Sequence, residues 1–282
     1  MIWRSLLGIA ALLAPLRASD LQDAADAAMR GYTGAAVVME VASGRLLAQV
    51  HPEVAARRLA RPGSAVKPFT LQALQERGRA QAVLVCGRKL TLGDREMDCT
   101  HPVLAGPLDA VAALAYSCNF YFSTLAAGLR GPDLVEALTR AGLTARTGLS
   151  ASEAVGEILP PQSAAQRQLL ALGEANIRVT PLGLLWAYRK MALHERTIAS
   201  EGLEAAAAYG TARLAAPRGV KIAGKTGTAS DPGSGRIHAW FAGYGPAGTP
   251  RIAVVVFLEQ GGGGRDAAPI ARKLFEAALP AP

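Results

Sequence analysis

The sequence has no apolar run that reaches the roughly 20 residues of a membrane-spanning helix. Aromatic residues make up only 5% of it, and no basic cluster is interleaved with them, which argues against a nucleic-acid-binding surface. The four histidines form no HExxH pair of the metalloprotease kind. There is no GxSxG nucleophile elbow, and no GK[ST] follows the glycine-rich loop 261–264, so an α/β-hydrolase and a phosphate-binding loop are both disfavoured.

Lysine is also scarce, with six lysines against 24 arginines. Two of the six stand in short strings of a recognisable kind, namely SAVK at 64–67 and KTGT at 225–228. A general base beside a serine must be able to lose its proton. Lysine can do so when it is desolvated or close to another cation, whereas arginine cannot. Lysine in both strings therefore argues for chemistry rather than chance.

What is present describes an exported globular protein. Half of the residues are hydrophobic, and 282 residues can bury one large core or two packed subdomains. Arg4 precedes the apolar stretch 5–16, so residues 1–18 are predicted to be a signal peptide or an uncleaved N-terminal anchor, with cleavage expected after Ala18. Residues 19–282 are then the folded unit. The net charge of +8 suits an anionic cell envelope, although a solvated basic surface is the preferred explanation of the charge itself.

The three cysteines could form a disulfide, bind a metal ion or remain free thiols. Cys86 and Cys99 flank the glycine-containing segment 87–98, which is expected to form a small hairpin, and export permits a disulfide at its base. We therefore predict a Cys86–Cys99 disulfide. A zinc site would need more ligands, because His101 is close but nothing else nearby has ligand spacing. Cys118 is expected to be a free, semi-buried thiol, and no metal or cofactor is expected.

Strand signals lie near both ends of the sequence. Segments 35–41 and 45–50, on either side of a Ser-Gly turn, predict two strands. Three more strands are predicted at 219–224, 237–244 and 251–258, and the last is a continuous apolar run typical of a buried central strand.

The region between these strands, about 64–215, is expected to be a mostly helical insertion. The predicted helices include 108–115, 120–129, 132–140, 182–193 and 201–214, with others at 21–29 and 267–278. The sequence thus predicts an α/β fold of the α+β type. One five-stranded antiparallel sheet, built from 35–50 and 219–258, would be flanked by helices.

The string SAVK places a serine where it can be activated. A Pro-Gly turn precedes Ser64, and a helix that begins there would point free N–H groups at the group the serine attacks. Ser64 and Lys67 are three residues apart and share a helical face, so Lys67 can take the serine proton. Pro68 disfavours helical geometry at Lys67, and such local conflicts tend to occur at functional sites.

The string SCN at 117–119 is expected at a break between two helices. Both Ser117 and Asn119 could then point into a cleft, where Ser117 could relay a proton to a leaving amine and Asn119 could bind a substrate amide. Alone, a Ser-x-Asn string is more often a cap or a turn than a site.

The string KTGT is expected on a strand. Gly227 would allow a ligand to approach the backbone closely. Lys225 and Thr226 could hold a substrate carboxylate, and the backbone N–H of Thr228 could form an oxyanion hole together with that of Ser64.

The segments RPGSAVKPF, YSCNFYF, NIRVTPLGLLWAYRKMA, AGKTGTA and HAWFAGYGP resemble the transpeptidase domain of penicillin-binding proteins from about Ala35 onward. The resemblance implies an acylated nucleophile at Ser64 with Lys67 as its base. It implies Ser117 as proton relay, Asn119 as substrate ligand, and a carboxylate and oxyanion side formed by Lys225, Thr226, Gly227 and Thr228.

The resemblance also implies the biological setting. The substrate would be a peptidoglycan stem peptide ending in D-Ala-D-Ala, with β-lactams as covalent inhibitors and cell-wall proteins as partners. The protein would act in the periplasm or on the outer face of the cytoplasmic membrane, with membrane contact only through an uncleaved residue 1–18 segment. D,D-transpeptidation is the leading interpretation. A D,D-carboxypeptidase, a serine β-lactamase and a non-catalytic β-lactam or wall-fragment sensor remain as alternatives.

Overall fold

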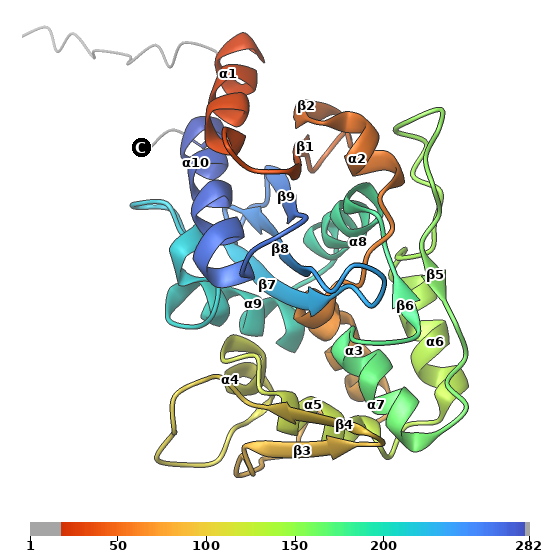
Figure 1. Ribbon diagram of the computed structural model, residues 1–282. Helices are drawn as coiled ribbons and strands as arrows, with labels where there is room; N and C mark the ends of the chain where they lie inside the picture. Colours follow the sequence, from red (N-terminus) through yellow and green to blue (C-terminus); the bar gives the residue numbers. More distant parts are fainter. Residues whose placement is uncertain (1–17, 280–282) are drawn as a thin grey trace, which may run out of the picture.

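A five-stranded antiparallel sheet lies at the centre of the computed structural model, which describes residues 18–279 (Figure 1). Its strand order is β2-β1-β9-β8-β7. The five strands are β1 (Gly34–Glu40), β2 (Leu46–Val50), β7 (Ala223–Ser230), β8 (Ile237–Gly245) and β9 (Ile252–Leu258). Since β1 pairs with β9, the two ends of the sequence meet in mid-sheet, and the predicted fold class is confirmed.

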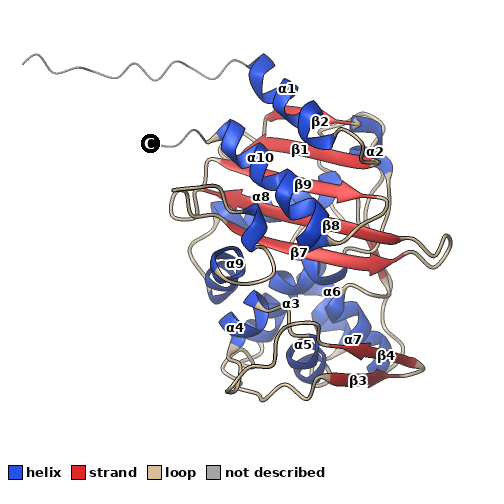
Figure 2. Ribbon diagram, turned by 60° about the vertical axis from the view of Figure 1, so that its left-hand side comes forward, coloured by secondary structure: helices blue, strands red, loops and turns tan. Residues whose placement is uncertain are grey.

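Both faces of the sheet are covered by helices (Figure 2). Helices α1 (Ala18–Met29) and α10 (Ala268–Ala278) lie on one face, and α2 (Pro52–Arg57) and α8 (Pro181–Leu193) lie on the other. The central strand β9 is apolar at every position because its alternating side chains enter two separate cores. Val254, Val256 and Leu258 enter the core beneath α10, while Val255 and Phe257 enter the core beneath α8.

Most of the chain between β2 and β7, apart from α2 and α8, forms a helical layer beside the sheet. It consists of α3 (Lys67–Glu76), α4 (Ala110–Ala115), α5 (Asn119–Ala126), α6 (Gly131–Arg140), α7 (Ala164–Leu172) and α9 (Ile198–Ala208). Helix α3 lies at its centre and packs against α5, α6, α7 and α9. Phe69, Leu71 and Leu74 of α3 are buried in the same core as the α8 face of the sheet. The layer and the sheet therefore share one hydrophobic core.

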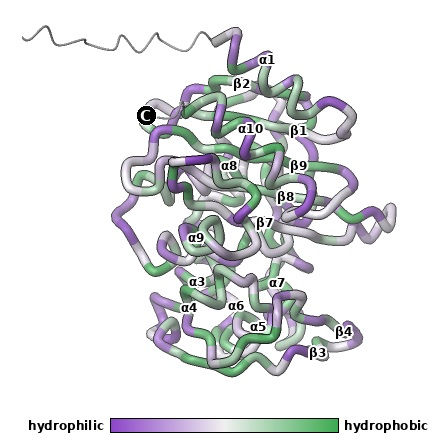
Figure 3. Tube along the Cα trace, turned by 90° about the vertical axis from the view of Figure 1, so that its left-hand side faces the viewer, coloured by the Kyte–Doolittle hydropathy of each residue, from purple (hydrophilic) through white to green (hydrophobic). Residues whose placement is uncertain are grey.

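Two small two-stranded sheets lie outside the main sheet. Strands β3 (Lys89–Leu92) and β4 (Arg95–Asp98) form the hairpin that the sequence predicts, and hydrophilic residues gather at its turn, in contrast to the apolar β9 (Figure 3). The pairing of β5 (Glu157–Ile158) with β6 (Ile177–Arg178) was not expected. It is only two residues long on each side, too short for an alternating pattern to mark it.

Two element boundaries differ from the sequence prediction, and one helix, α7, had no prediction of its own. Strand β7 begins at Ala223 rather than near Gly219, because Gly219 has a φ of +75°, which interrupts an extended strand. Helix α9 begins earlier than expected, since Thr197 forms a capping box with Ser200, and it ends at Ala208. Helix α7 begins after the cap residue Ser163 and ends before a left-handed glycine.

The predicted leader, residues 1–18, lies outside the described residues except for Ala18, where α1 begins. Within residues 18–279 there is no helix with the length and apolar character needed to cross a membrane.

Candidate active site

Ser64 lies on a short 3-10 helix, Gly63–Val66, that runs directly into α3 at Lys67. Pro68 does not break this arrangement. It occupies the first turn of α3, where backbone N–H groups have no intrahelical partner and proline is tolerated. Lys67 keeps helical φ and ψ angles of −56° and −34° despite the following proline. The local conflict seen in the sequence is thus resolved by starting the α-helix at the lysine.

Glycine brings the third motif against the nucleophile turn. A Cβ atom at Gly227 would lie 2.3 Å from the carbonyl oxygen of Pro62, and one at Gly63 would lie 2.5 Å from that of Thr228. Gly63 also has a φ of +52°, and its N–H donates to the carbonyl oxygen of Gly173 at 3.0 Å. Any side chain at Gly63 or Gly227 would push β7 away from Ser64. The role of Gly227 is therefore close approach of the protein's own backbone.

Lys67 joins the first motif to the second. Its side chain is fully buried, and Nζ donates to the carbonyl oxygen of Ser117 at 2.7 Å, to Oγ of Ser117 at 3.2 Å and to Oδ1 of Asn119 at 2.7 Å. Burial lowers the pKa of Lys67 from 10.5 to about 8, while Cys118, Cys99 and Glu174 oppose that shift. A lysine with this pKa can act as a proton acceptor near neutral pH.

Ser117 and Asn119 are held rigidly for this contact. Ser117 has a φ of +57°, a conformation that non-glycine residues adopt at a cost of order 1–3 kcal/mol and that is concentrated at functional sites. Nδ2 of Asn119 donates to the carbonyl oxygen of Asp98 at 3.1 Å, which turns Oδ1 toward Lys67. The string therefore lies at the helix break that the sequence predicted, between α4 and α5.

Lys225 is a second fully buried lysine at the site. Its Nζ donates to the carbonyl oxygen of Thr226 at 3.0 Å and to Oγ1 of Thr211 at 3.3 Å. Burial, and then the charge of Lys67, hold the pKa of Lys225 well below 10.5. Thr228 is exposed, and its Oγ1 accepts a hydrogen bond from the N–H of Gly263 at 3.1 Å, so its hydroxyl hydrogen is free to donate outward.

Glu174 belongs to this neighbourhood and was missed by the sequence analysis. It follows Gly173, the hydrogen-bond partner of Gly63, and only 12% of its side chain is exposed. Burial raises the pKa of the Glu174 carboxyl, although Arg95, at 3.5 Å, and Lys67 act in the opposite direction. Its position just ahead of the NIRVTP segment was the one signal in the sequence that could have pointed to it.

His238 lies at the edge of this region and contacts charged side chains. It is buried on β8, and its Nε2 lies 3.3 Å from Glu259 and 3.3 Å from the guanidinium of Arg58. Arg58 also binds Glu259 at 2.7 Å and Asp231 at 3.3 Å. Burial lowers the pKa of His238, which favours its neutral form. These contacts link the end of α2 to the ends of β7, β8 and β9.

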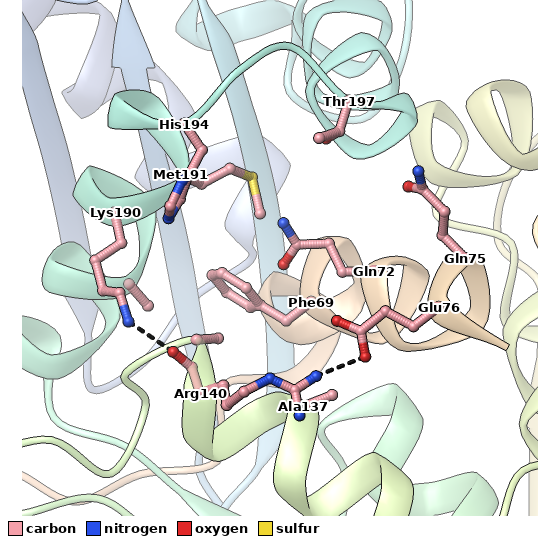
Figure 4. A pocket seen from close by; sticks show the side chains of 12 residues that line it. Phe69, Gln72, Gln75, Glu76, Ala137, Arg140, Lys190, Met191, His194 and Thr197 are labelled. Atoms are coloured by element: carbon pink, nitrogen blue, oxygen red, sulfur yellow. Dashed lines mark hydrogen bonds and ion pairs between the residues drawn. The ribbon is translucent and has the colours of Figure 1, made fainter.

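Two pockets of about 420 Å³ lie outside the motif cluster. One is bounded by α3, α6 and α8, where Glu76 binds Arg140 at 2.6 Å and Lys190 caps the end of α6 (Figure 4). The other is lined by 58–61, 176–178 and 231–233, among other residues. It reaches Arg61, three residues before Ser64 in the sequence.

The predicted Cys86–Cys99 disulfide is not formed in this structure, in which Cys86, Cys99 and Cys118 are all free thiols. The hairpin register shows which residue stands opposite Cys99. Lys89 pairs with Asp98, and the N–H of Cys99 donates to the carbonyl oxygen of Arg88, so Arg88 and not Cys86 stands opposite Cys99. Cys118 is fully buried rather than semi-buried.

Comparison with known proteins adds a family. Residues 34–276 match the family described as the penicillin binding protein transpeptidase domain. The peptidoglycan D,D-transpeptidase PbpA of Mycolicibacterium smegmatis is 29% identical over 77% of this chain and 55% of that protein, so the chain spans about half the length of this relative.

Solved structures agree on the fold. The PBP2 of Pseudomonas aeruginosa in complex with WCK 5153 superposes with a TM-score of 0.81 at 24% identity, covering 93% of this chain and 77% of that one. The imipenem acyl-enzyme of penicillin-binding protein A from M. tuberculosis gives 0.77 at 23% identity, covering 92% and 78%.

Proposed function

The chain belongs to the family of penicillin-binding protein transpeptidase domains, and we propose that it is a serine D,D-transpeptidase that crosslinks peptidoglycan through an acyl-enzyme at Ser64. The observation that carries this proposal is the meeting of three distant motifs around one buried lysine. Lys67 binds Ser117 and Asn119, and Gly227 contacts the turn that holds Ser64.

In the proposed acylation step, Oγ of Ser64 attacks the carbonyl carbon between the two D-Ala residues of a stem peptide. Neutral Lys67 takes the Oγ proton, and its pKa of about 8 supports this role. The C–N bond then breaks, and the terminal D-Ala leaves as an amine that receives a proton through Ser117. The distance of 3.2 Å between Oγ of Ser117 and Nζ of Lys67 supports that relay.

Two backbone N–H groups, those of Ser64 and Thr228, are proposed to stabilise the oxyanion that forms on the attacked carbonyl. This pairing is supported by the contact between Gly63 and the backbone of Thr228. Removing one donor from such a site typically lowers the rate by about 10²–10³-fold.

The substrate carboxylate is proposed to lie beside Thr226 and Thr228. Because Lys225 is fully buried and bound to Thr226 and Thr211, it would act on the carboxylate through its charge and by fixing the strand. An anion at this place would favour protonation of Lys225, whose pKa burial and Lys67 hold down. Substrate binding and the charge of the site would thus be coupled.

The fate of the acyl-enzyme separates the leading function from a second candidate. An acceptor amine would complete transpeptidation, whereas water would make the protein a D,D-carboxypeptidase. The second outcome is favoured by Glu174, a largely buried carboxyl with a raised pKa near Lys67, since such a group can accept a proton from an attacking water.

The wider setting follows from family membership and is proposed with it. Stem peptides ending in D-Ala-D-Ala would be the substrates, β-lactams the covalent inhibitors and cell-wall proteins the partners. The protein would be exported by a leader within residues 1–18 and would act in the periplasm or on the outer face of the membrane, with residues 19–282 as one transpeptidase unit.

Intact-mass spectrometry of the purified protein with penicillin, followed over time, tests the proposal. We expect one adduct per chain that maps to Ser64 and lasts for hours. Ser64→Ala should give none, and Ser234→Ala, at an exposed turn residue, should behave like the wild type. An adduct lost within milliseconds would indicate a serine β-lactamase. A stable adduct without any reaction on stem peptides would indicate a sensor.

A further inference from the structure

Four side chains converge beside the second motif without a role in the proposed proton transfers. They are Cys86, before the β3–β4 hairpin, Cys99 and His101, after it, and Cys118, at the start of α5. Their ligand atoms all lie within 4.8 Å of one another. Cys99, His101 and Cys118 are buried, and Cys86 is partly buried.

The spacing of the sulfurs suits a tetrahedral metal ion. Sγ of Cys99 lies 3.9 Å from Sγ of Cys118. A tetrahedral zinc ion binds cysteine sulfur at about 2.3 Å, which separates two such sulfurs by about 3.8 Å. Three thiolates and one imidazole form a soft donor set of the kind that binds zinc in closed structural sites.

His101 is already in the form that a metal requires. Its Nδ1 lies 2.8 Å from the carbonyl oxygen of Pro102, so Nδ1–H donates to that oxygen and Nε2 carries the lone pair. Nε2 is buried and has no hydrogen-bond partner among residues 18–279. A buried acceptor without a partner is costly, and a metal ion at the centre of the four ligand atoms would satisfy it.

Each sulfur also receives a backbone N–H. The donors are Arg88 to Cys86 at 3.4 Å, Phe120 to Cys99 at 3.3 Å and Tyr121 to Cys118 at 3.4 Å. Hydrogen bonds of this kind orient metal ligands and stabilise the thiolate form. We propose that Cys86, Cys99, His101 and Cys118 bind one structural zinc ion.

The fold adds a fourth ligand that the sequence spacing did not reveal. Sequence spacing offered Cys86, Cys99 and His101 but too few ligands, and the fourth comes from the middle of the SCN string, 19 residues after Cys99. Because Cys118 stands between Ser117 and Asn119, the ion would anchor both partners of Lys67 to the segment around the β3–β4 hairpin. With four protein ligands, no position is left for a reacting water, so the role is structural.

Metal binding to the wild-type protein tests the site without relying on the proposed activity. The full chain is reduced, stripped with a chelator, and titrated with Zn²⁺ under native mass spectrometry and with Co²⁺ under absorption spectroscopy. We expect one ion per chain, a thiolate-to-cobalt charge-transfer band, and a higher melting temperature with zinc. A wild-type protein that retains no ion, or a cobalt spectrum without the thiolate band, would overturn the proposal.

Substitutions of the proposed ligands test where the zinc ion binds. His101→Ala and Cys118→Ser should lose stoichiometric zinc, and Cys118→Ser keeps a side chain that can still cap α5. His194→Ala changes an exposed histidine outside the cluster and should bind zinc like the wild type. Retention of zinc by both cluster variants would refute the assignment, as would non-reducing peptide maps that find these cysteines in a disulfide. None of these readouts depends on acylation, so a failure of the proposed function would leave them unchanged.

Discussion

Nζ of Lys67 lies 2.7 Å from Oδ1 of Asn119, and Nδ2 of the same amide binds the carbonyl oxygen of Asp98 at 3.1 Å. The amide therefore cannot rotate without losing one of these two bonds. Lys67 is held by a polar but uncharged partner, which fixes its position without raising its pKa as a carboxylate would. Burial can then lower the pKa of the amine to about 8.

The acylation rate should depend on pH through Lys67. The neutral amine is the active form, and burial lowers its pKa to about 8. The second-order rate constant for a fluorescent penicillin should rise by about tenfold per pH unit below pH 8 and level off above it. A profile that stays flat across this range would exclude Lys67 as the titrating base.

The two buried lysines should respond differently to replacement by arginine. Lys67→Arg keeps the charge but removes the ability to act as a base, so the acylation rate should fall by about 10²–10⁴-fold. Lys225→Arg should retain more activity and mainly weaken apparent binding. Thermal melts control for folding, because both sites are fully buried and arginine is larger. Equal losses in the two variants would assign Lys225 to the proton path.

Glu174→Gln distinguishes hydrolysis from transfer. If the carboxylate activates water, the acyl-enzyme should persist at least about tenfold longer in this variant, while the acylation rate changes little. Glu157→Gln is the matched control, since Glu157 pairs with Arg178 on the surface. Pre-steady-state mass spectrometry measures both steps. An unchanged lifetime would leave Glu174 without a part in deacylation.

Gly227→Ala should disturb the nucleophile turn. The added methyl would lie 2.3 Å from the carbonyl oxygen of Pro62, so β7 and the turn must move apart at a cost of about 1–3 kcal/mol in the free energy of unfolding. Acylation should fall as well, because the N–H of Thr228 would leave its place. Gly106→Ala is the control, since its added methyl would have no atom of residues 18–279 beyond its chain neighbours within 4 Å. Equal stability and activity in both variants would contradict the close packing.

Local patterns in the sequence predicted the strands of the main sheet. The apolar run of β9 marked a central strand, and the SAVK and KTGT strings marked residues that the structure brings together. The strand predicted at 219–224 begins only at Ala223, and it includes the KTGT string, which was expected on a strand. Glu174 and the meeting of Cys86 with Cys118 depend on tertiary packing between distant segments, which no local pattern encodes.

The pairing of β1 with β9 also affects the rate at which the protein folds. Gly34 pairs in register with Leu258, so the sheet closes a loop that contains most of the chain. Closing so long a loop costs conformational entropy before the stabilising contacts between the strands can form. Proteins dominated by contacts of this kind fold slowly. During synthesis, the edge of β1 that pairs with β9 has no partner strand until β9 has been synthesised. Conditions that slow or interrupt production of the last strands should therefore leave an apolar hairpin open to aggregation.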